Sequence, residues 1–192
     1  MAKNVRRPPT RKELGLEERF TDKIFRPYAL AIGQAALAWN ALHEQLGSLF
    51  WTVSGGGGVD RRLRKWRSLR NDRVKRDELL ALAKAKLNLL SDRDKTTFEE
   101  IKWILDSIKW IKLATGRNRT IHAPLASTPR TLDVFADTLF GNPFADELEK
   151  VDVLAEYRRV RDRATLLRDY TGQLAEAVSR DRPVWPDRPK LP

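Results

Sequence analysis

Residues 35–53 read AALAWNALHEQLGSLFWTV, and this stretch decides the fold. Its main apolar side chains recur at alternating spacings of four and three, at Ala35, Trp39, Leu42, Leu46, Leu49 and Val53. With about 3.6 residues per turn, that spacing gathers them on one face of an α-helix. The pattern predicts a helix over 26–53, with Pro27 tolerated in its first turn. The four consecutive glycines 55–58 end it, because glycine does not hold a helix.

The chain after the glycines predicts three further helical segments. The first covers about 60–90, where Leu63, Trp66 and Leu69 recur on one side and Asn71-Asp72 offers a break. The second covers about 93–122, capped by Ser91 or Asp92 and stopped before Pro124. The last covers about 146–179 and has an apolar four-three rhythm. Such a seam packs in a bundle or against a second copy of the protein.

Together these segments predict an all-α fold, a four-helix-type bundle with long helices and an irregular segment, 124–145, before the last helix. A short extended piece is expected at 131–135. We divide the chain into a basic mobile arm (1–24), a helical domain (25–180) and a Pro-rich tail (181–192). The tail is expected to be extended, with Trp185 docking on the rest of the protein.

Composition excludes several classes of protein. The chain has 192 residues, no cysteine and two histidines, so disulfide frameworks, zinc knuckles and thiol nucleophiles are excluded. We expect no metal and no cofactor. The N-terminus has no signal-peptide pattern, and the most apolar run, 28–50, is interrupted by polar side chains. We therefore expect a cytoplasmic protein that does not enter membranes.

The net charge of +11 is concentrated in two segments. Residues 1–26 carry eight basic and four acidic side chains, residues 60–76 carry nine and two, and the remainder is neutral. Two basic surfaces on a neutral scaffold are typical of polyanion binding, although a solvated helix face and a tail would give the same charges. Charge alone does not separate RNA from DNA, an acidic protein or a membrane surface. The candidate nucleic-acid contacts in the second segment are Arg61, Arg62, Arg64, Lys65, Arg67 and Arg70.

The candidate catalytic residues lie at the end of the third predicted helix, in the segment GRNRTIHAP at 116–124. Asn118 and His122 are four apart and share a face, so Asn118 can orient the imidazole while Arg117 reaches round from the adjacent face. Arginine neutralises a phosphodiester and histidine moves protons, and Arg119 is a further nucleic-acid contact. The alternative is a polar helix end with His122 satisfied by a backbone carbonyl.

A single histidine in this segment limits what one copy can do. Internal phosphoryl transfer in RNA needs a base at the 2′-OH and an acid at the departing 5′ oxygen. One imidazole cannot occupy both positions, so a catalytic role for His122 calls for a homodimer with two copies at one site. No carboxylate cluster suggests magnesium, which favours a metal-free reaction on RNA.

The stretch Arg117-Asn118-Arg119-Thr120-Ile121-His122 resembles the Arg-polar-x₃-His signature of the HEPN superfamily (higher eukaryotes and prokaryotes nucleotide-binding domains). Residues 38–50 are similar to the opening helix of many bacterial members, and the helix order agrees over about 25–180. The resemblance implies an α-helical bundle, frequent dimers and metal-independent RNase activity in many members. Arg117 would then contact phosphate, His122 would be the acid–base group and Asn118 its polar support. Many such RNases are toxins or act in phage defence, which implies an antitoxin or regulatory partner.

Other candidates and functions stay open. His43 lies beside the core stripe of the first helix and is expected to be structural, while Glu44 can pair with Arg117 if their helices pack together. The leading hypothesis is a dimeric HEPN-type endoribonuclease that leaves 2′,3′-cyclic phosphate ends. The alternatives are a non-catalytic helical module that binds nucleic acid or a partner protein, and a DNA-binding regulator.

Overall fold

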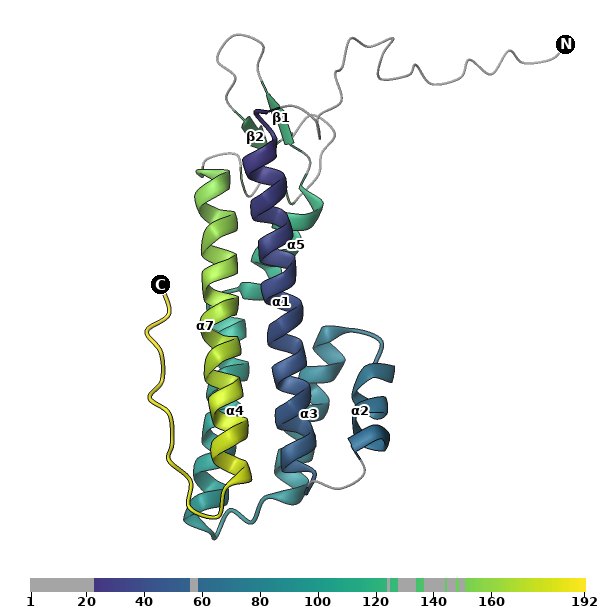
Figure 1. The fold of residues 1–192 in the computed structure, drawn as a ribbon, viewed down its shortest axis with the longest axis vertical. Helices are drawn as coiled ribbons and strands as arrows, with labels where there is room; N and C mark the ends of the chain where they lie inside the picture. The colour runs from purple at the N-terminus through teal and green to yellow at the C-terminus, as the bar shows by residue number, and fades with distance from the viewer. Residues whose placement is uncertain are drawn as a thin grey trace, which may run out of the picture.

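The computed structural model describes residues 23–55, 59–123, 125–127, 134–136, 144, 148 and 151–192. The protein is an all-α bundle, as the sequence predicts (Figure 1). No helix in the described ranges is long and apolar enough to cross a membrane. The predicted arm, 1–24, lies almost entirely outside the described residues.

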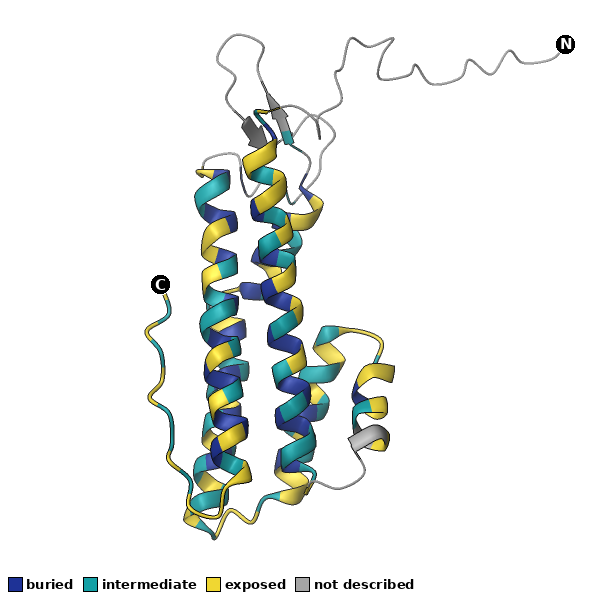
Figure 2. Cartoon of the chain, viewed as in Figure 1, coloured by how far each residue is buried: buried dark blue, intermediate teal, exposed yellow. Residues whose placement is uncertain are grey.

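The two longest helices, α1 (Arg26–Val53) and α7 (Val153–Ser179), form the spine of the bundle (Figure 1). They run parallel, because Arg161 bonds Gln34 at 3.0 Å while Gly172 lies against Gln45, eleven positions further along both helices. Figure 2 shows buried positions as a stripe along both helices. The stripe predicted from 35–53 forms part of the main core, packed against α7 residues such as Leu167 and Leu174.

Helices α2 (Val59–Ser68) and α3 (Asp72–Lys86) replace the single segment of 60–90, with the break at the predicted place. Asn71 caps α3, since its side-chain oxygen accepts from the N–H of Val74 at 2.9 Å. The short basic helix α2 is held on α1 by Trp66, which is buried against Phe50 with 5.4 Å between ring centroids.

The prediction of one helix over about 93–122 is wrong in one respect, because the structure has two helices there. Helix α4 (Asp92–Trp110) ends at Ile111, and α5 (Leu113–His122) starts after Lys112, whose φ of 49° is left-handed. On a continuous helix, Leu113 would lie about 180° from Ile104, nine residues earlier. Both side chains are fully buried, so the chain must rotate between them. The sequence carries no glycine or proline at this joint. The helix breaks there because both side chains must be buried in the core.

The remaining segments frame the bundle. Strands β1 (Leu125–Ser127) and β2 (Val134–Ala136) pair antiparallel, so part of the extended piece predicted at 131–135 belongs to β2, while 131–133 lie outside the described residues. Helix α7 starts later than predicted, since Asp152 caps it through the N–H of Ala155 at 2.9 Å.

The Pro-rich tail is extended and returns along the bundle (Figure 1). Arg188 grips Glu100 with two hydrogen bonds of 2.8 and 3.0 Å, and its guanidinium lies 5.4 Å from the ring centroid of Trp103. Trp185 packs against the main core, as the sequence predicts.

Candidate functional site

Helix α5 carries Arg117, Asn118 and His122 and lies close against α7. A Cβ on Gly116 would approach the Val160 side chain to 2.9 Å, so only glycine allows this contact. The hydroxyl of buried Thr120 donates to the Gly116 carbonyl at 2.9 Å. The tight packing fixes the helix that presents the motif.

The Arg117 guanidinium is held in place by three groups. Its Nη2 donates to Asp72 Oδ2 at 3.1 Å, and its Nη1 donates to Asn118 Oδ1 at 2.9 Å. The guanidinium carbon also lies 5.4 Å from the centroid of the Trp39 ring. Trp39 Nε1 donates to the same Asp72 oxygen at 2.7 Å, so helices α1, α3 and α5 meet at this carboxylate.

Asp72 is ionised in this setting. Burial disfavours its charge, but His43, the Trp39 hydrogen bond and Arg117 outweigh burial and lower the pKa of Asp72 below its ordinary value. The carboxylate is therefore a charged anchor for Arg117 at neutral pH.

His43 lies one helical turn beyond Trp39 and extends the network. Burial lowers its pKa to about 4, so the ring is neutral at neutral pH. Arg76 Nη1 lies 3.1 Å from His43 Nε2, and His43 Nδ1 lies 3.2 Å from the Trp39 carbonyl oxygen. Since arginine only donates, Nε2 accepts from Arg76 and Nδ1–H donates to the carbonyl. His43 is thus a structural acceptor for Arg76, in line with the structural role expected from the sequence.

His122 is the last residue of α5 and is exposed. Its ring centroid lies 5.9 Å from that of Phe144. Arg117 is directed towards Asp72 and Trp39, on the side of α1 and α3. The structure therefore places the two motif residues on one helix, with the histidine exposed and the arginine partly buried.

Two sequence-predicted residues have other surroundings than expected. The carboxylate paired with Arg117 is Asp72, whereas Glu44 is exposed on α1. Arg119 pairs with Glu156 of α7 at 3.2 Å, with side chains only 18% and 11% exposed. Arg119 thus joins α5 to α7, and its guanidinium is held by Glu156 in this structure; its contact with nucleic acid stays a prediction.

The predicted nucleic-acid contacts in α2 and the turn after it are largely at the surface. Lys65 pairs with Glu78 of α3, and the side chain of Arg62 lies outside the described residues. The remaining four are exposed: Arg61, Arg64, Arg67 and Arg70.

Positions along α1 show how far this basic surface lies from the motif. Trp66 of α2 packs at Gly47, Arg117 lies over Trp39, and Ala123 clusters with Ala31. At about 1.5 Å per residue, Arg117 is about 12 Å and the end of α5 about 24 Å from the level of Gly47. The basic surface and the motif therefore lie at different levels along α1.

Sequence reasoning missed Trp39, Asp72 and Arg76 as site residues. In the sequence, Trp39 has the spacing of a core residue, and Asp72 is one of only two acidic residues in the basic segment 60–76. The pairs Trp39–Asp72 and His43–Arg76 both span 33 residues and are offset by one helical turn. Only the parallel packing of α1 and α3 brings them together.

No family model matches the chain, and no curated protein and no solved structure matches it. Within the described part of the chain, no group of three or more His, Asp or Glu side chains is placed to hold a metal ion. The interpretation of this site therefore rests on its own residues.

Proposed function

We propose that the protein is a HEPN-type endoribonuclease of the cytoplasm that cleaves RNA without a metal, at a site shared by two copies of the chain. The observation that carries the proposal is the geometry of α5. An exposed His122 ends the helix, and Arg117, five residues before it, has a guanidinium oriented by Asp72 and Asn118. A preoriented cation and an exposed imidazole on one short helix are the groups that cleavage of a phosphodiester uses.

In this reaction one His122 takes the proton from a 2′-OH, and the 2′ oxygen attacks the adjacent phosphorus. The bond from phosphorus to the 5′ oxygen breaks, and His122 of the second copy gives that oxygen a proton. Arg117 stabilises the negative charge that builds up on the phosphoryl oxygens. The products are a 2′,3′-cyclic phosphate and a 5′-OH end.

The basic surface of α2 supplies attraction at a distance from the chemistry. Its exposed arginines lie roughly 12 Å along α1 from the level of Arg117. An RNA strand bound at both places spans several nucleotides, and its affinity falls as salt is raised. By resemblance, the activity belongs to a toxin or phage-defence effector that an antitoxin or regulatory protein restrains.

The decisive experiment compares the wild type with His122→Ala on a labelled single-stranded RNA in EDTA, with product ends mapped. We expect cleavage with cyclic-phosphate ends in the wild type and loss of cleavage in the variant. Arg158→Gln, which removes an exposed cation on α7, is the matched control and should cleave normally. Full activity of His122→Ala would refute the proposal.

A mixing experiment tests whether the site is shared. If each site needs His122 from both copies, equal amounts of wild type and His122→Ala give active dimers as about one quarter of the total, because only wild-type pairs act. A site confined to one copy would leave about half of the activity.

The alternative function is a non-catalytic module that binds nucleic acid or a partner. The ion pair between Arg117 and Asp72 favours it, since a guanidinium already paired is less available to a phosphate. RNA that stays intact with the wild type while binding it would decide for this alternative.

A further inference from the structure

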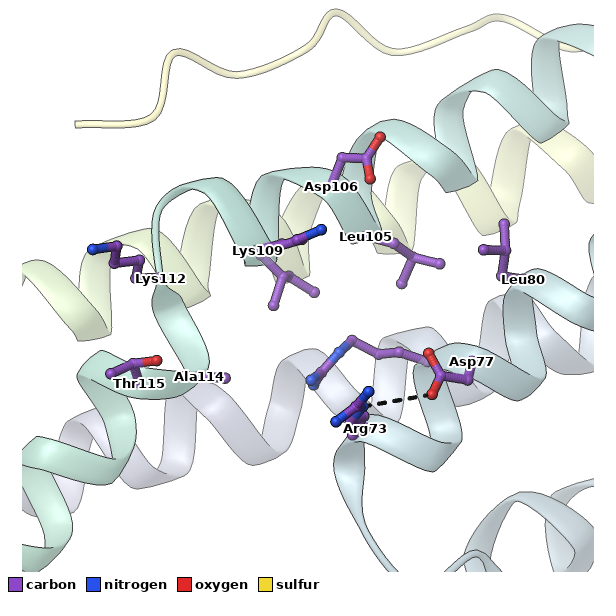
Figure 3. Close-up of a pocket in the computed structure, with 11 residues that line it drawn as sticks. Arg73, Asp77, Leu80, Leu105, Asp106, Lys109, Lys112, Ala114 and Thr115 are labelled. Carbon is purple, nitrogen blue, oxygen red and sulfur yellow. Dashed lines mark ion pairs between the residues drawn. The ribbon is translucent and has the colours of Figure 1, made fainter.

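A pocket of about 630 Å³ lies between α3, α4 and the start of α5, apart from His122 (Figure 3). Its volume is in the range of pockets that bind small molecules. In Figure 3, α4 runs along one side of the pocket and α3 along the other, with Ala114 and Thr115 of α5 at one end. None of the lining residues belongs to the motif 117–122.

The charge of the lining favours an anion. Four cations line the pocket, Arg73, Arg76, Lys109 and Lys112, against the two carboxylates of Asp77 and Asp106. The carboxylate of Asp77 is 3.9 Å from Arg73 Nε, and both side chains are more than 70% exposed, so the pair is loose. The lining therefore carries an excess of two positive charges.

The partly buried Arg76 also favours an anion in the pocket. Burial lowers the pKa of Arg76, and the neighbouring charges of Arg117 and Arg73 also lower it, against the opposing effect of Asp72. An anion in the pocket would offset that unfavourable crowding of cations. The N–H groups at the start of α5 add to the same field, since Lys112, which precedes the helix, has no acceptor to cap them.

The other end of the pocket carries two leucines. Leu80 and Leu105 lie there, away from Lys112 and Thr115, with Arg73 and Lys109 between the two ends and with Asp77 and Asp106 near the leucines (Figure 3). Ile108 adds further apolar lining. A ligand that fills the space thus has a charged end and an apolar body.

We propose that this pocket binds a small phosphate ester whose body is apolar or aromatic and of about nucleotide size. Its phosphate lies between Arg73, Lys109 and Lys112, where guanidinium and ammonium groups donate charge-assisted hydrogen bonds. Its body lies against Leu80 and Leu105. This proposal does not rest on the proposed function, since none of the lining residues belongs to the motif 117–122.

Calorimetric titration of the full chain with AMP, adenosine and inorganic phosphate tests the proposal. We expect saturable binding of AMP, none of adenosine, and weaker binding of phosphate. The double variant Lys109→Gln/Lys112→Gln should weaken AMP binding at least about tenfold, or 1.4 kcal/mol. Both side chains are exposed, so the fold should persist, which the thermal unfolding curve checks.

The matched control is Lys102→Gln, which removes an exposed lysine from α4 outside the pocket. It should leave the AMP dissociation constant within about twofold. Absence of saturable binding up to about 5 mM AMP would overturn the proposal. Equal weakening by Lys102→Gln, or inorganic phosphate binding as tightly as AMP, would overturn it as well.

Discussion

Lowering the pH should reduce the free energy of unfolding because of His43, and the substitution His43→Gln should remove this effect. In the folded protein the ring is buried and neutral, with Nε2 accepting from Arg76. Burial lowers its pKa from the ordinary 6.5 to about 4. Between these two values the unfolded chain binds a proton that the folded chain does not, so the free energy of unfolding falls as pH falls.

The size of the effect follows from the two pKa values. Between about pH 8 and pH 5 the single group removes about 2 kcal/mol from the free energy of unfolding. The full difference, about 3 kcal/mol, is reached only below pH 4. The pKa of Asp72 is lowered below its ordinary 3.8, so its stabilising charge is lost only at still lower pH, outside this window.

Urea unfolding followed by circular dichroism, at about pH 8, 6.5 and 5, measures the effect. The comparison is with His43→Gln, whose amide is uncharged throughout and can still accept from Arg76. We expect the wild type to lose about 2 kcal/mol more than the variant across the range. His122 is present in both proteins, so its contribution to the pH dependence cancels in the comparison. Identical pH slopes for the two proteins would refute a buried neutral His43.

Two further predictions concern α1 and the arginine anchor. Gly47→Ala should lower the free energy of unfolding in urea by about 1–3 kcal/mol, because the new Cβ would lie 2.7 Å from Trp66 Nε1. Gly33→Ala on the same helix places a Cβ that meets nothing within 4 Å, and it should raise the free energy of unfolding by about 0.5–1 kcal/mol. Equal effects at both positions would contradict this prediction. Asp72→Asn should slow single-turnover RNA cleavage at least about tenfold through misplacement of Arg117, with RNA affinity by anisotropy little changed, and an unaltered rate would count against the anchoring role.

The parts of the fold that the sequence predicts are those set by local pattern. The stripe of α1 and the break at Asn71 are decided by residues within a few turns of each other. In α1 the apolar spacing alone specifies which face is buried. The side chain of Asn71 supplies the cap of α3 itself.

The parts that the sequence does not predict depend on packing between distant segments. The joint at Lys112 arises because Ile104 and Leu113 must both face the core, and neither residue signals that demand alone. Asp72 becomes the partner of Arg117 only when α3 lies beside α1 and α5. For the candidate site, the sequence points to the motif residues themselves, whereas Asp72, the carboxylate that orients Arg117, was not predicted.

The first turns of α3 connect the two proposed sites. Asp72 and Arg76, one helical turn apart, face Arg117 and His43, while Arg73 lines the pocket. Arg76 belongs to both, because it lines the pocket and touches His43. The negative charge of a phosphate held between Arg73, Lys109 and Lys112 would also attract the Arg76 guanidinium and so offset its attraction to Asp72, leaving more of that carboxylate's charge for Arg117. Occupancy of the proposed pocket and the hold on Arg117 would then be linked through one arginine, and linkage of this kind acts equally in both directions.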